Sequence, residues 1–342
     1  MRGCFSAILI LAAGCATQST TPPPQYHVVS HIAVGGEGGW DDLSVDNSAH
    51  RLYVSHSDRV NVIDLVSGKV IGEIGNTQGV HAIALAPSLR RGFVSDGRTS
   101  SVTIFDLDSL QTLSEVKSSG ERPDAMVFDP SSSLVFAFNA GSNNATAIDA
   151  ATGVVKGTID LGGKPEFARS DRHGMVYVNV EDTSEIVAID SQALAVVRRW
   201  SLAPCQEPSG LALDIAHHRL FSACDNQVMA ISDTDAGRVI TTVSIGEGVD
   251  GAAWDPGSGL AFSSNGRSGT LTVVRENSPT EFSVLANVAT SPGARTVALD
   301  EGTHHLYLPT ARFGPAPAPT ADRPHPRPSI LPGTFEILDV GP

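Results

Sequence analysis

The chain has 342 residues, of which 37 are acidic and 23 basic, so its formal net charge is −14. A surface this acidic argues against binding to a nucleic-acid backbone, which requires clustered Lys and Arg, and against docking on anionic lipid head groups. The same charge favours cationic partners.

The N-terminal residues predict export as a lipoprotein. Arg2 precedes the apolar run 5–13, which is too short to span a bilayer and is typical of the core of a signal peptide. The run ends in the sequence LAAGC at 11–15, which resembles the lipobox of bacterial lipoproteins. We therefore expect Cys15 to be lipidated and to anchor the protein in the bacterial cell envelope, facing the periplasm (outer membrane favoured) or the cell surface. The alternative is an ordinary signal peptide in which Cys15 has no role.

Beyond the N-terminal region, one apolar phrase recurs seven times. The copies are LYVS (52–55), GFVS (92–95), VFAF (135–138), VYVN (176–179), LFSA (220–223), LAFS (260–263) and LYLP (306–309). A strand-like stretch and a turn precede each copy, and most copies are followed by a third strand ending near Asp and by a fourth strand. Four short strands repeated every 40 to 45 residues or so indicate the blades of a β-propeller.

The seventh repeat lacks a fourth strand. Its third strand is FEILD (335–339), and only three residues follow that strand. An isolated strand, 26–34, lies before the first repeat and has the missing length and alternation. We expect it to complete the last blade and close the ring, which removes an exposed sheet edge.

The predicted fold is therefore an all-β, seven-bladed β-propeller whose ring is closed by the N-terminal strand, which completes the last blade. The predicted organisation is a signal peptide (1–14), a lipidated cysteine with a flexible tether (15–25) and a single monomeric propeller (26–342).

With the phrase Tyr53-Val54-Ser55 in its first copy, the repeat resembles that of the bacterial YVTN/YncE-like family of β-propellers over essentially the whole mature chain. The resemblance implies the fold. Some relatives resemble single-stranded DNA binders, but the negative charge of this chain argues against nucleic acid as a partner. Propellers carry many unrelated activities, so function has to be argued from the site.

Alignment of the repeats predicts a ring of residues at one mouth of the central channel, one from each blade. These residues are Asp41, His81, Asp124, Glu166, Ser209, Asp250 and Arg295. A second set, from the loops between second and third strands, is expected on the same rim and includes His56, Asp96, Asn139, Glu181, Asn226 and Asn265. We interpret both sets as candidates for ligand binding. The alternative is that the acids cap turns or are solvated.

Clustered carboxylates repel one another unless something compensates them, and a bound cation is one compensation. Oxygen ligands suit Ca²⁺, so Asp124, Glu166 and Asp250 are candidate ligands for a metal whose identity stays open. The six-bladed lactonases hold Ca²⁺ with such residues, which is an analogy only. The pairs His217-His218 and His304-His305 are expected in exposed turns on the opposite rim.

Of the four cysteines, Cys4 belongs to the signal peptide and Cys15 is the expected lipidation site. Cys205 and Cys224 remain, and an exported compartment permits them to form a disulfide. Placing Leu211 opposite Ser222 across the hairpin puts Cys224 opposite Ser209, within reach of the loop that carries Cys205. The alternative is two separate thiols.

Residues 311–332 interrupt the seventh repeat with a proline-rich stretch on the same rim as the mouth, here named the rim insertion. It is expected to be a lid, a docking arm or a disordered insertion.

The sequence contains no nucleophile elbow, phosphate loop, HExxH or CxxCH motif. We therefore expect a binding or scaffold protein of the cell envelope that recognises a small ligand or an envelope protein at the mouth. The alternative is a metal-dependent, Ca²⁺-type lactonase-like hydrolase that uses the acidic mouth.

Overall fold

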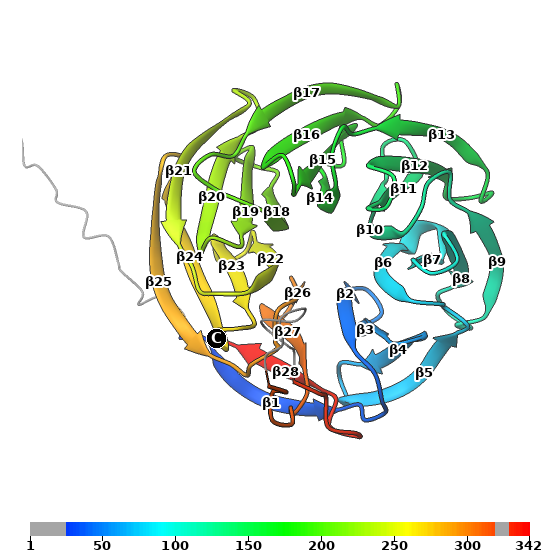
Figure 1. The fold of residues 1–342 in the computed structure, drawn as a ribbon, viewed down its shortest axis with the longest axis vertical. Coiled ribbons are helices and arrows are strands. Elements are labelled where there is room, and N and C mark those ends of the chain that lie inside the picture. Colours follow the sequence, from blue (N-terminus) through cyan, green and yellow to red (C-terminus); the bar gives the residue numbers. More distant parts are fainter. Residues whose placement is uncertain (1–24, 319–327) are drawn as a thin grey trace, which may run out of the picture.

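A computed structural model describes residues 25–318 and 328–342. The chain forms seven four-stranded antiparallel sheets, and Figure 1 shows them arranged as blades around a central axis. Apart from the short 3₁₀ helix η1 (Pro87–Leu89), every regular element in these two ranges is a strand. The predicted all-β, seven-bladed propeller is confirmed. None of the described helices has the length and apolar character needed to cross a membrane.

Each blade runs from an inner strand at the channel to an outer strand. Blade 1 consists of β2 (Trp40–Asp46), β3 (Arg51–His56), β4 (Arg59–Asp64) and β5 (Lys69–Gly75). Blade 2 consists of β6 (Val80–Ala86), β7 (Arg91–Asp96), β8 (Ser101–Asp106) and β9 (Thr112–Lys117). Blade 3 consists of β10 (Pro123–Asp129), β11 (Leu134–Asn139), β12 (Asn144–Asp149) and β13 (Val155–Asp160). Blade 4 consists of β14 (Pro165–Ser170), β15 (Met175–Val180), β16 (Glu185–Asp190) and β17 (Ala195–Ser201).

The remaining blades follow the same order along the chain. Blade 5 consists of β18 (Pro208–Asp214), β19 (Arg219–Cys224), β20 (Val228–Asp233) and β21 (Arg238–Ser244). Blade 6 consists of β22 (Val249–Asp255), β23 (Leu260–Asn265), β24 (Thr270–Ser278) and β25 (Glu281–Ala289). Blade 7 consists of β26 (Ala298–Asp300), β27 (His305–Thr310), β28 (Glu336–Gly341) and β1 (His27–Ala33).

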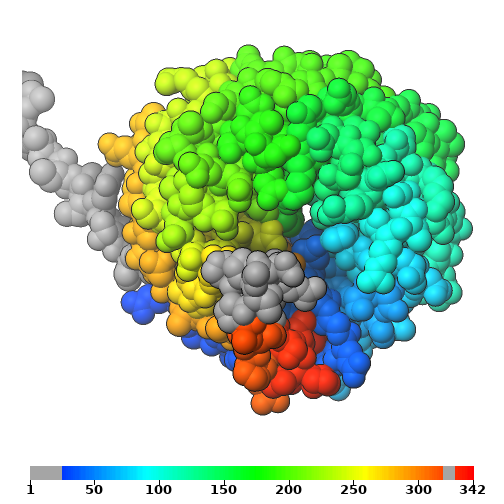
Figure 2. All heavy atoms as spheres, viewed as in Figure 1, coloured from blue at the N-terminus to red at the C-terminus, as the bar shows by residue number. Residues whose placement is uncertain are grey.

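The N-terminal strand closes the ring as predicted. β1 pairs antiparallel with β28, from His27 opposite Gly341 to Ala33 opposite Glu336, and becomes the outer strand of blade 7. Figure 1 shows this blue strand beside the red strand β28, and Figure 2 shows blue N-terminal and red C-terminal residues on the same side of the ring. Because the two ends of the chain share one sheet, the last blade has the same four strands as the others.

The repeated phrase of the sequence forms the second strand of each blade. The third residue of this strand is aromatic in all seven blades and lies between neighbouring sheets: Tyr53, Phe93, Phe136, Tyr177, Phe221, Phe262 and Tyr307, each at most 7% exposed. The apolar core accordingly divides into clusters that each join two adjacent blades, such as Phe136 and Phe138 of blade 3 with Val178 of blade 4. A single blade cannot bury both of its faces, so packing in a ring provides the burial that stabilises the fold.

Each of the first six inner strands is irregular at its N-terminal end. In blade 1 the pairing passes from Trp40 opposite His56 to Leu43 opposite Val54, so Asp41 and Asp42 form a bulge, and blades 2 to 6 show shifts at the corresponding place. A β-bulge redirects side chains at the end of a strand. These bulges lie where the predicted mouth residues are.

The opposite ends of the inner strands form the far rim, the end of the channel away from these bulges. There, in five of the seven blades, an Asp closes the strand and accepts hydrogen bonds from the following turn. Asp129 in blade 3 is the most fully bonded of them, since it accepts hydrogen bonds from the hydroxyls of Ser132, Ser170 and Ser191, each 2.7 Å long. Two of these serines belong to blade 4, so this carboxylate joins two blades.

Candidate ligand-binding site at the channel mouth

The seven residues predicted at the mouth converge on one cavity of about 890 Å³. Asp41, His81, Asp124, Glu166, Ser209, Asp250 and Arg295 all line it. This volume lies in the range of pockets that hold small ligands, about 300–1,000 Å³. The repeat alignment thus located the residues of one cavity, while their role in binding stays a prediction.

Most of the mouth residues belong to a single polar network. Arg295 donates from Nε to Oδ2 of Asp250 (2.6 Å) and from Nη2 to Oδ1 of Asp41 (3.0 Å). The hydroxyl of Ser209 donates to the other oxygen of Asp250 (2.6 Å). One guanidinium therefore connects blades 6, 7 and 1.

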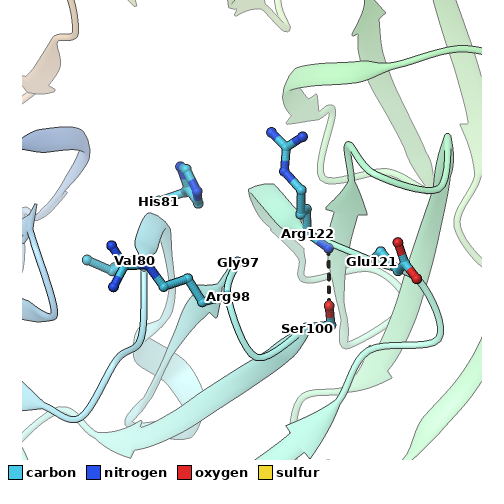
Figure 3. A pocket seen from close by; sticks show the side chains of 8 residues that line it. Val80, His81, Gly97, Arg98, Ser100, Glu121 and Arg122 are labelled. Atoms are coloured by element: carbon cyan, nitrogen blue, oxygen red, sulfur yellow. Dashed lines mark hydrogen bonds between the residues drawn. The ribbon is translucent and has the colours of Figure 1, made fainter.

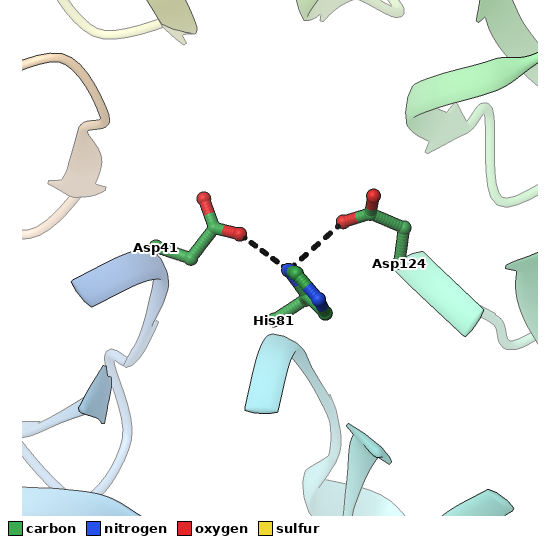
Figure 4. A group of neighbouring side chains, drawn as sticks. All are labelled: Asp41, His81 and Asp124. Atoms are coloured by element: carbon green, nitrogen blue, oxygen red, sulfur yellow. Dashed lines mark hydrogen bonds and ion pairs between the residues drawn. The ribbon is translucent and has the colours of Figure 1, made fainter. Parts of the chain in front are cut away.

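The network continues through His81, whose ring lies between two carboxylates (Figure 4). Nδ1 of His81 lies 2.7 Å from Oδ2 of Asp41 and 3.4 Å from Oδ1 of Asp124. The hydrogen bond to Asp41 raises the pKa of His81, because it favours the imidazolium form. The three side chains come from blades 1, 2 and 3.

On the other side of the mouth, Lys164 lies between two acids of blade 4. Its ammonium is 2.7 Å from Oε1 of Glu166 and also contacts the carboxylate of Glu181. Glu181, from the second predicted set, therefore lines the cavity as expected. Each of the two acids is partly neutralised by the same lysine.

The cavity wall carries more negative than positive charge. Eight acids line it, Asp41, Asp42, Asp124, Glu166, Glu181, Glu207, Asp225 and Asp250, against Lys164, Arg267, Arg295 and the titratable His81. Burial raises the pKa of Asp124 and of Asp250, although His81 and Arg295 act in the opposite direction. Carboxylates whose ionisation is disfavoured in this way would be stabilised in their charged form by a cation.

Two further residues inside the channel were not predicted. Burial raises the pKa of Asp42, in the bulge of blade 1, to about 7, against the effect of Arg169. Arg169 of blade 4 reaches to blade 6, where Nη2 lies 3.4 Å from the carbonyl oxygen of Ala252. The corresponding positions of the other inner strands hold mostly small or apolar residues, and this break in the repeat is the signal that could have identified both.

The structure corrects the expected position of four residues of the second set. His56, Asp96, Asn139 and Asn265 are at most 2% exposed and do not line the mouth cavity. Each bonds instead to the third residue of the next strand of its own blade: His56 to Asn61 (3.0 Å), Asp96 to Thr103 (2.6 Å), Asn139 to Thr146 (2.9 Å) and Asn265 to Thr272 (2.8 Å). Their side chains point between the sheets, because they lie on a face of the second strand that a neighbouring element covers.

The three candidate metal ligands do not form one ligand group. Among the described residues, the mouth set close enough to share an ion is Asp41, His81 and Asp124. Of the predicted ligands only Asp124 belongs to it, because Glu166 is held by Lys164 and Asp250 by Arg295. Lys164 and Arg295 thus occupy carboxylate oxygens that a metal ion would need.

The rim insertion contributes one wall of the cavity. Phe313, Pro328 and Ile330 line it, and Phe313 forms an isolated antiparallel bridge with Ile330. The ring of Phe313 lies 6.1 Å from that of Trp40, beside the mouth. The expected rim position is thus found for the two ends of the insertion, while residues 319–327 lie outside the described residues.

A groove of about 560 Å³ adjoins the cavity between blades 2 and 3, and Figure 3 shows the side chains that line it. It shares His81 with the cavity, and its other charged residues are Arg98, Arg122 and Glu121. The groove is therefore more basic than the acidic mouth beside it.

The predicted disulfide is present and supports this rim. Cys205 and Cys224 are bonded, with Cα atoms 5.7 Å apart, and both side chains are buried. Leu211 lies opposite Ser222 as expected, but the bulge places Cys224 opposite Pro208 and not opposite Ser209. The bond anchors the loop that carries Glu207 at the cavity wall. Cys15, the predicted lipidation site, lies outside the described residues.

Comparisons with known proteins support the fold. No protein-family model matches the chain, and no characterised protein matches its sequence. A chain in the crystal structure of the mitotic checkpoint complex is similar with a TM-score of 0.75 at 14% identity, over 98% of this chain and 99% of that one. The RRP9 WD40 repeats give 0.75 at 10% identity, over 92% and 99%. A chain of Kuenenia stuttgartiensis hydrazine synthase gives 0.69 at 16% identity, over 82% and 94%. At these identities the likeness shows the fold alone, a seven-bladed β-propeller similar to those of WD40 repeats.

Proposed function

We propose that this chain is a binding propeller of the YVTN/YncE-like kind, and that its mouth cavity accepts a ligand carrying a positively charged group. The observation that carries the proposal is the excess of carboxylates around one cavity of about 890 Å³. A cationic group placed among them relieves their repulsion, and water is displaced from an already concave site.

The cavity also offers an apolar side. Trp40, Phe167, Phe313 and Ile330 contribute to its wall next to the acids. A ligand with an amine or guanidinium group and an apolar body therefore matches the wall better than a free metal ion or a sugar does. Lys- or Arg-containing peptides and organic amines are the chemical classes that fit.

The test is calorimetric titration of the purified chain with organic amines and Lys- or Arg-containing tripeptides, each beside a neutral analogue of similar shape. We expect the cations alone to bind, with an affinity that falls as salt is raised. Asp42→Asn and Asp124→Asn are expected to weaken binding, whereas Glu301→Gln, an equal loss of charge on an exposed turn of the far rim, leaves it unchanged. Equal binding of charged and neutral probes would contradict the proposal.

A metal-dependent, lactonase-like hydrolase is the second candidate, and it is favoured by one observation. Asp41, His81 and Asp124 lie close enough together to hold an ion. An imidazole among the ligands suits Zn²⁺ or a similar ion better than Ca²⁺, which prefers oxygen. Metal analysis of the purified protein separates the candidates, since a stoichiometric ion that is lost in Asp124→Asn supports this one.

For the location of the protein, we propose lipid anchoring in the cell envelope through Cys15, on the strength of the sequence LAAGC at 11–15. Cys15→Ser is expected to abolish labelling with palmitate and to release the protein from the membrane fraction. Persistent labelling of this variant would exclude the assignment.

A further inference from the structure

On the far rim, blades 5 and 6 bring one imidazole and two carboxylates together. Asp214 ends β18, His217 lies in the turn that follows, and Glu276 is part of β24 in the next blade. Nδ1 of His217 is 2.6 Å from Oδ2 of Asp214 and 3.4 Å from Oε1 of Glu276. The ligand atoms of the three residues all lie within 4.8 Å of one another.

The carboxylate of Glu276 is buried without the hydrogen bonds that such a group normally has. Its side chain is 5% exposed, and neither carboxylate oxygen has a hydrogen-bond partner among the described residues. Burying a carboxylate without a partner is costly. Burial and the neighbouring Asp214 raise the pKa of Glu276, against the effects of His217 and Arg219.

The neighbouring groups compensate the carboxylate of Glu276 only in part. Asp214, 3% exposed at its side chain, accepts a hydrogen bond from the backbone N–H of Ala216 at Oδ1 (3.0 Å) and faces His217 with Oδ2. Nδ1–H of His217 can donate to one carboxylate only. Arg219 is engaged elsewhere, by Asp233 (3.1 Å) and by the carbonyl oxygen of Pro279 (2.9 Å).

Glu276 also lies where the repeat is broken. The third strands of blades 1 to 5 have six residues and end in Asp, whereas β24 has nine and continues through Arg275 to Ser278. This extension brings Glu276 to the turn of blade 5. The residue is therefore an addition specific to blade 6 and not part of the scaffold common to the repeats.

We propose that Asp214, His217 and Glu276 bind a divalent first-row metal ion of the Zn²⁺ type that links blade 5 to blade 6. One imidazole nitrogen with carboxylate oxygens is a ligand set that such ions accept, with water in the remaining positions. The His217 side chain is 55% exposed, so the ion can reach the site from solvent. The site is separate from the mouth and does not depend on the ligand proposed there.

The next blade junction provides an internal control. Nδ1 of His304 in blade 7 lies 2.9 Å from Oδ2 of Asp255 in blade 6, which is fully buried, so another imidazole–carboxylate contact lies between blades 6 and 7. No second carboxylate completes a group there among the described residues. His304→Ala therefore removes a far-rim imidazole that contacts a buried Asp without touching the proposed site.

The experiment is a Zn²⁺ titration of the chelator-treated full chain in competition with a chromophoric chelator, with Co²⁺ absorption and thermal unfolding as further readouts. We expect one ion per chain at this site and a higher melting temperature with Zn²⁺. Both effects should be lost in Glu276→Gln and in His217→Ala, with affinity reduced by more than about 100-fold, the upper end of what removing a supporting residue costs. His304→Ala and Asp124→Asn should retain them.

Absence of stoichiometric binding would overturn the proposal. Binding that survives both Glu276→Gln and His217→Ala, or that is lost in Asp124→Asn instead, would overturn it as well, and the last result would assign the ion to the mouth. His217 is largely exposed, so His217→Ala carries the test by itself if circular dichroism shows that Glu276→Gln does not fold.

Discussion

Arg295 of blade 7 and Asp41 of blade 1 form a hydrogen-bonded ion pair, with Nη2 3.0 Å from Oδ1, at the junction where the ring closes. The same guanidinium bonds Asp250 of blade 6 (2.6 Å). Without it, Asp41 would keep only its contact with His81, and Asp250 only its hydrogen bond from Ser209. Arg295 thus has a structural role in addition to lining the cavity.

We predict that Arg295→Met lowers the free energy of unfolding by about 2–3 kcal/mol, because hydrogen bonds to charged groups contribute on that scale. Urea unfolding measures the change. Arg267→Met is the control, since Arg267 pairs with Glu247 (3.2 Å) where both side chains are exposed, and its loss should cost less than about 1 kcal/mol. Equal losses of free energy of unfolding in the two variants would show that the ion pairs of Arg295 stabilise the fold no more than an exposed pair does.

The closing strand β1 is predicted to stabilise the whole ring. Ile32 is buried in the cluster between blades 7 and 1, whereas Val29 of the same strand is 49% exposed. Ile32→Ala should lower the free energy of unfolding by about 2–5 kcal/mol through the cavity it leaves. Val29→Ala, which leaves no cavity, should cost less than about 0.5 kcal/mol. Similar values for both variants would mean that β1 is not packed as described.

The disulfide between Cys205 and Cys224 is predicted to stabilise the fold by about 3 kcal/mol, according to the chain-entropy model for a loop of this size. The double variant Cys205→Ala, Cys224→Ala should show this loss in urea unfolding under oxidising conditions. Adding a reductant should destabilise the wild type and leave the variant unchanged. A reductant effect of the same size in both proteins would refute the assignment.

The buried carboxylate of Asp129 predicts a dependence of stability on pH. Burial alone would raise the pKa of Asp129, but hydrogen bonds from Ser132, Ser170 and Ser191 lower it below its ordinary value. A carboxyl group whose pKa is lower in the folded state stabilises the fold fully above its unfolded pKa of about 3.9, and this stabilisation is lost as the pH falls through the folded value.

Ser191→Ala should therefore cost about 1.5–3 kcal/mol at pH 7, and the difference from wild type should shrink below about pH 4. Unfolding by urea at a series of pH values measures it. Ser67→Ala serves as the control, because Ser67 donates to the exposed carboxylate of Asp64 (2.6 Å) and should matter little at any pH. A constant difference between pH 3 and pH 7 would contradict the role given to Asp129.

The sequence by itself determined the number of blades, the closing strand and the ring of mouth residues. Strand formation and the alternation of inward and outward residues are local properties, so a phrase such as Leu52-Tyr53-Val54-Ser55 predicts the same strand wherever it recurs. Asp41, His81 and Asp250 occupy equivalent positions of this repeat, and equivalent positions in a ring meet at the same end of the channel. The short hairpin likewise placed Cys224 within reach of the loop that carries Cys205, which allowed the disulfide without requiring it.

Only the tertiary structure decided which side chains meet across blades. The bulges interrupt the regular alternation, and for this reason the register predicted for Cys224 was shifted by one residue. His56 turned out to bond Asn61 inside its own blade, and Asp250 turned out to be held by Arg295 of the next blade. Glu276 meets His217 only because an extended hairpin of one blade reaches the turn of another. Such contacts depend on the relative position of whole sheets, which packing sets and no local pattern encodes.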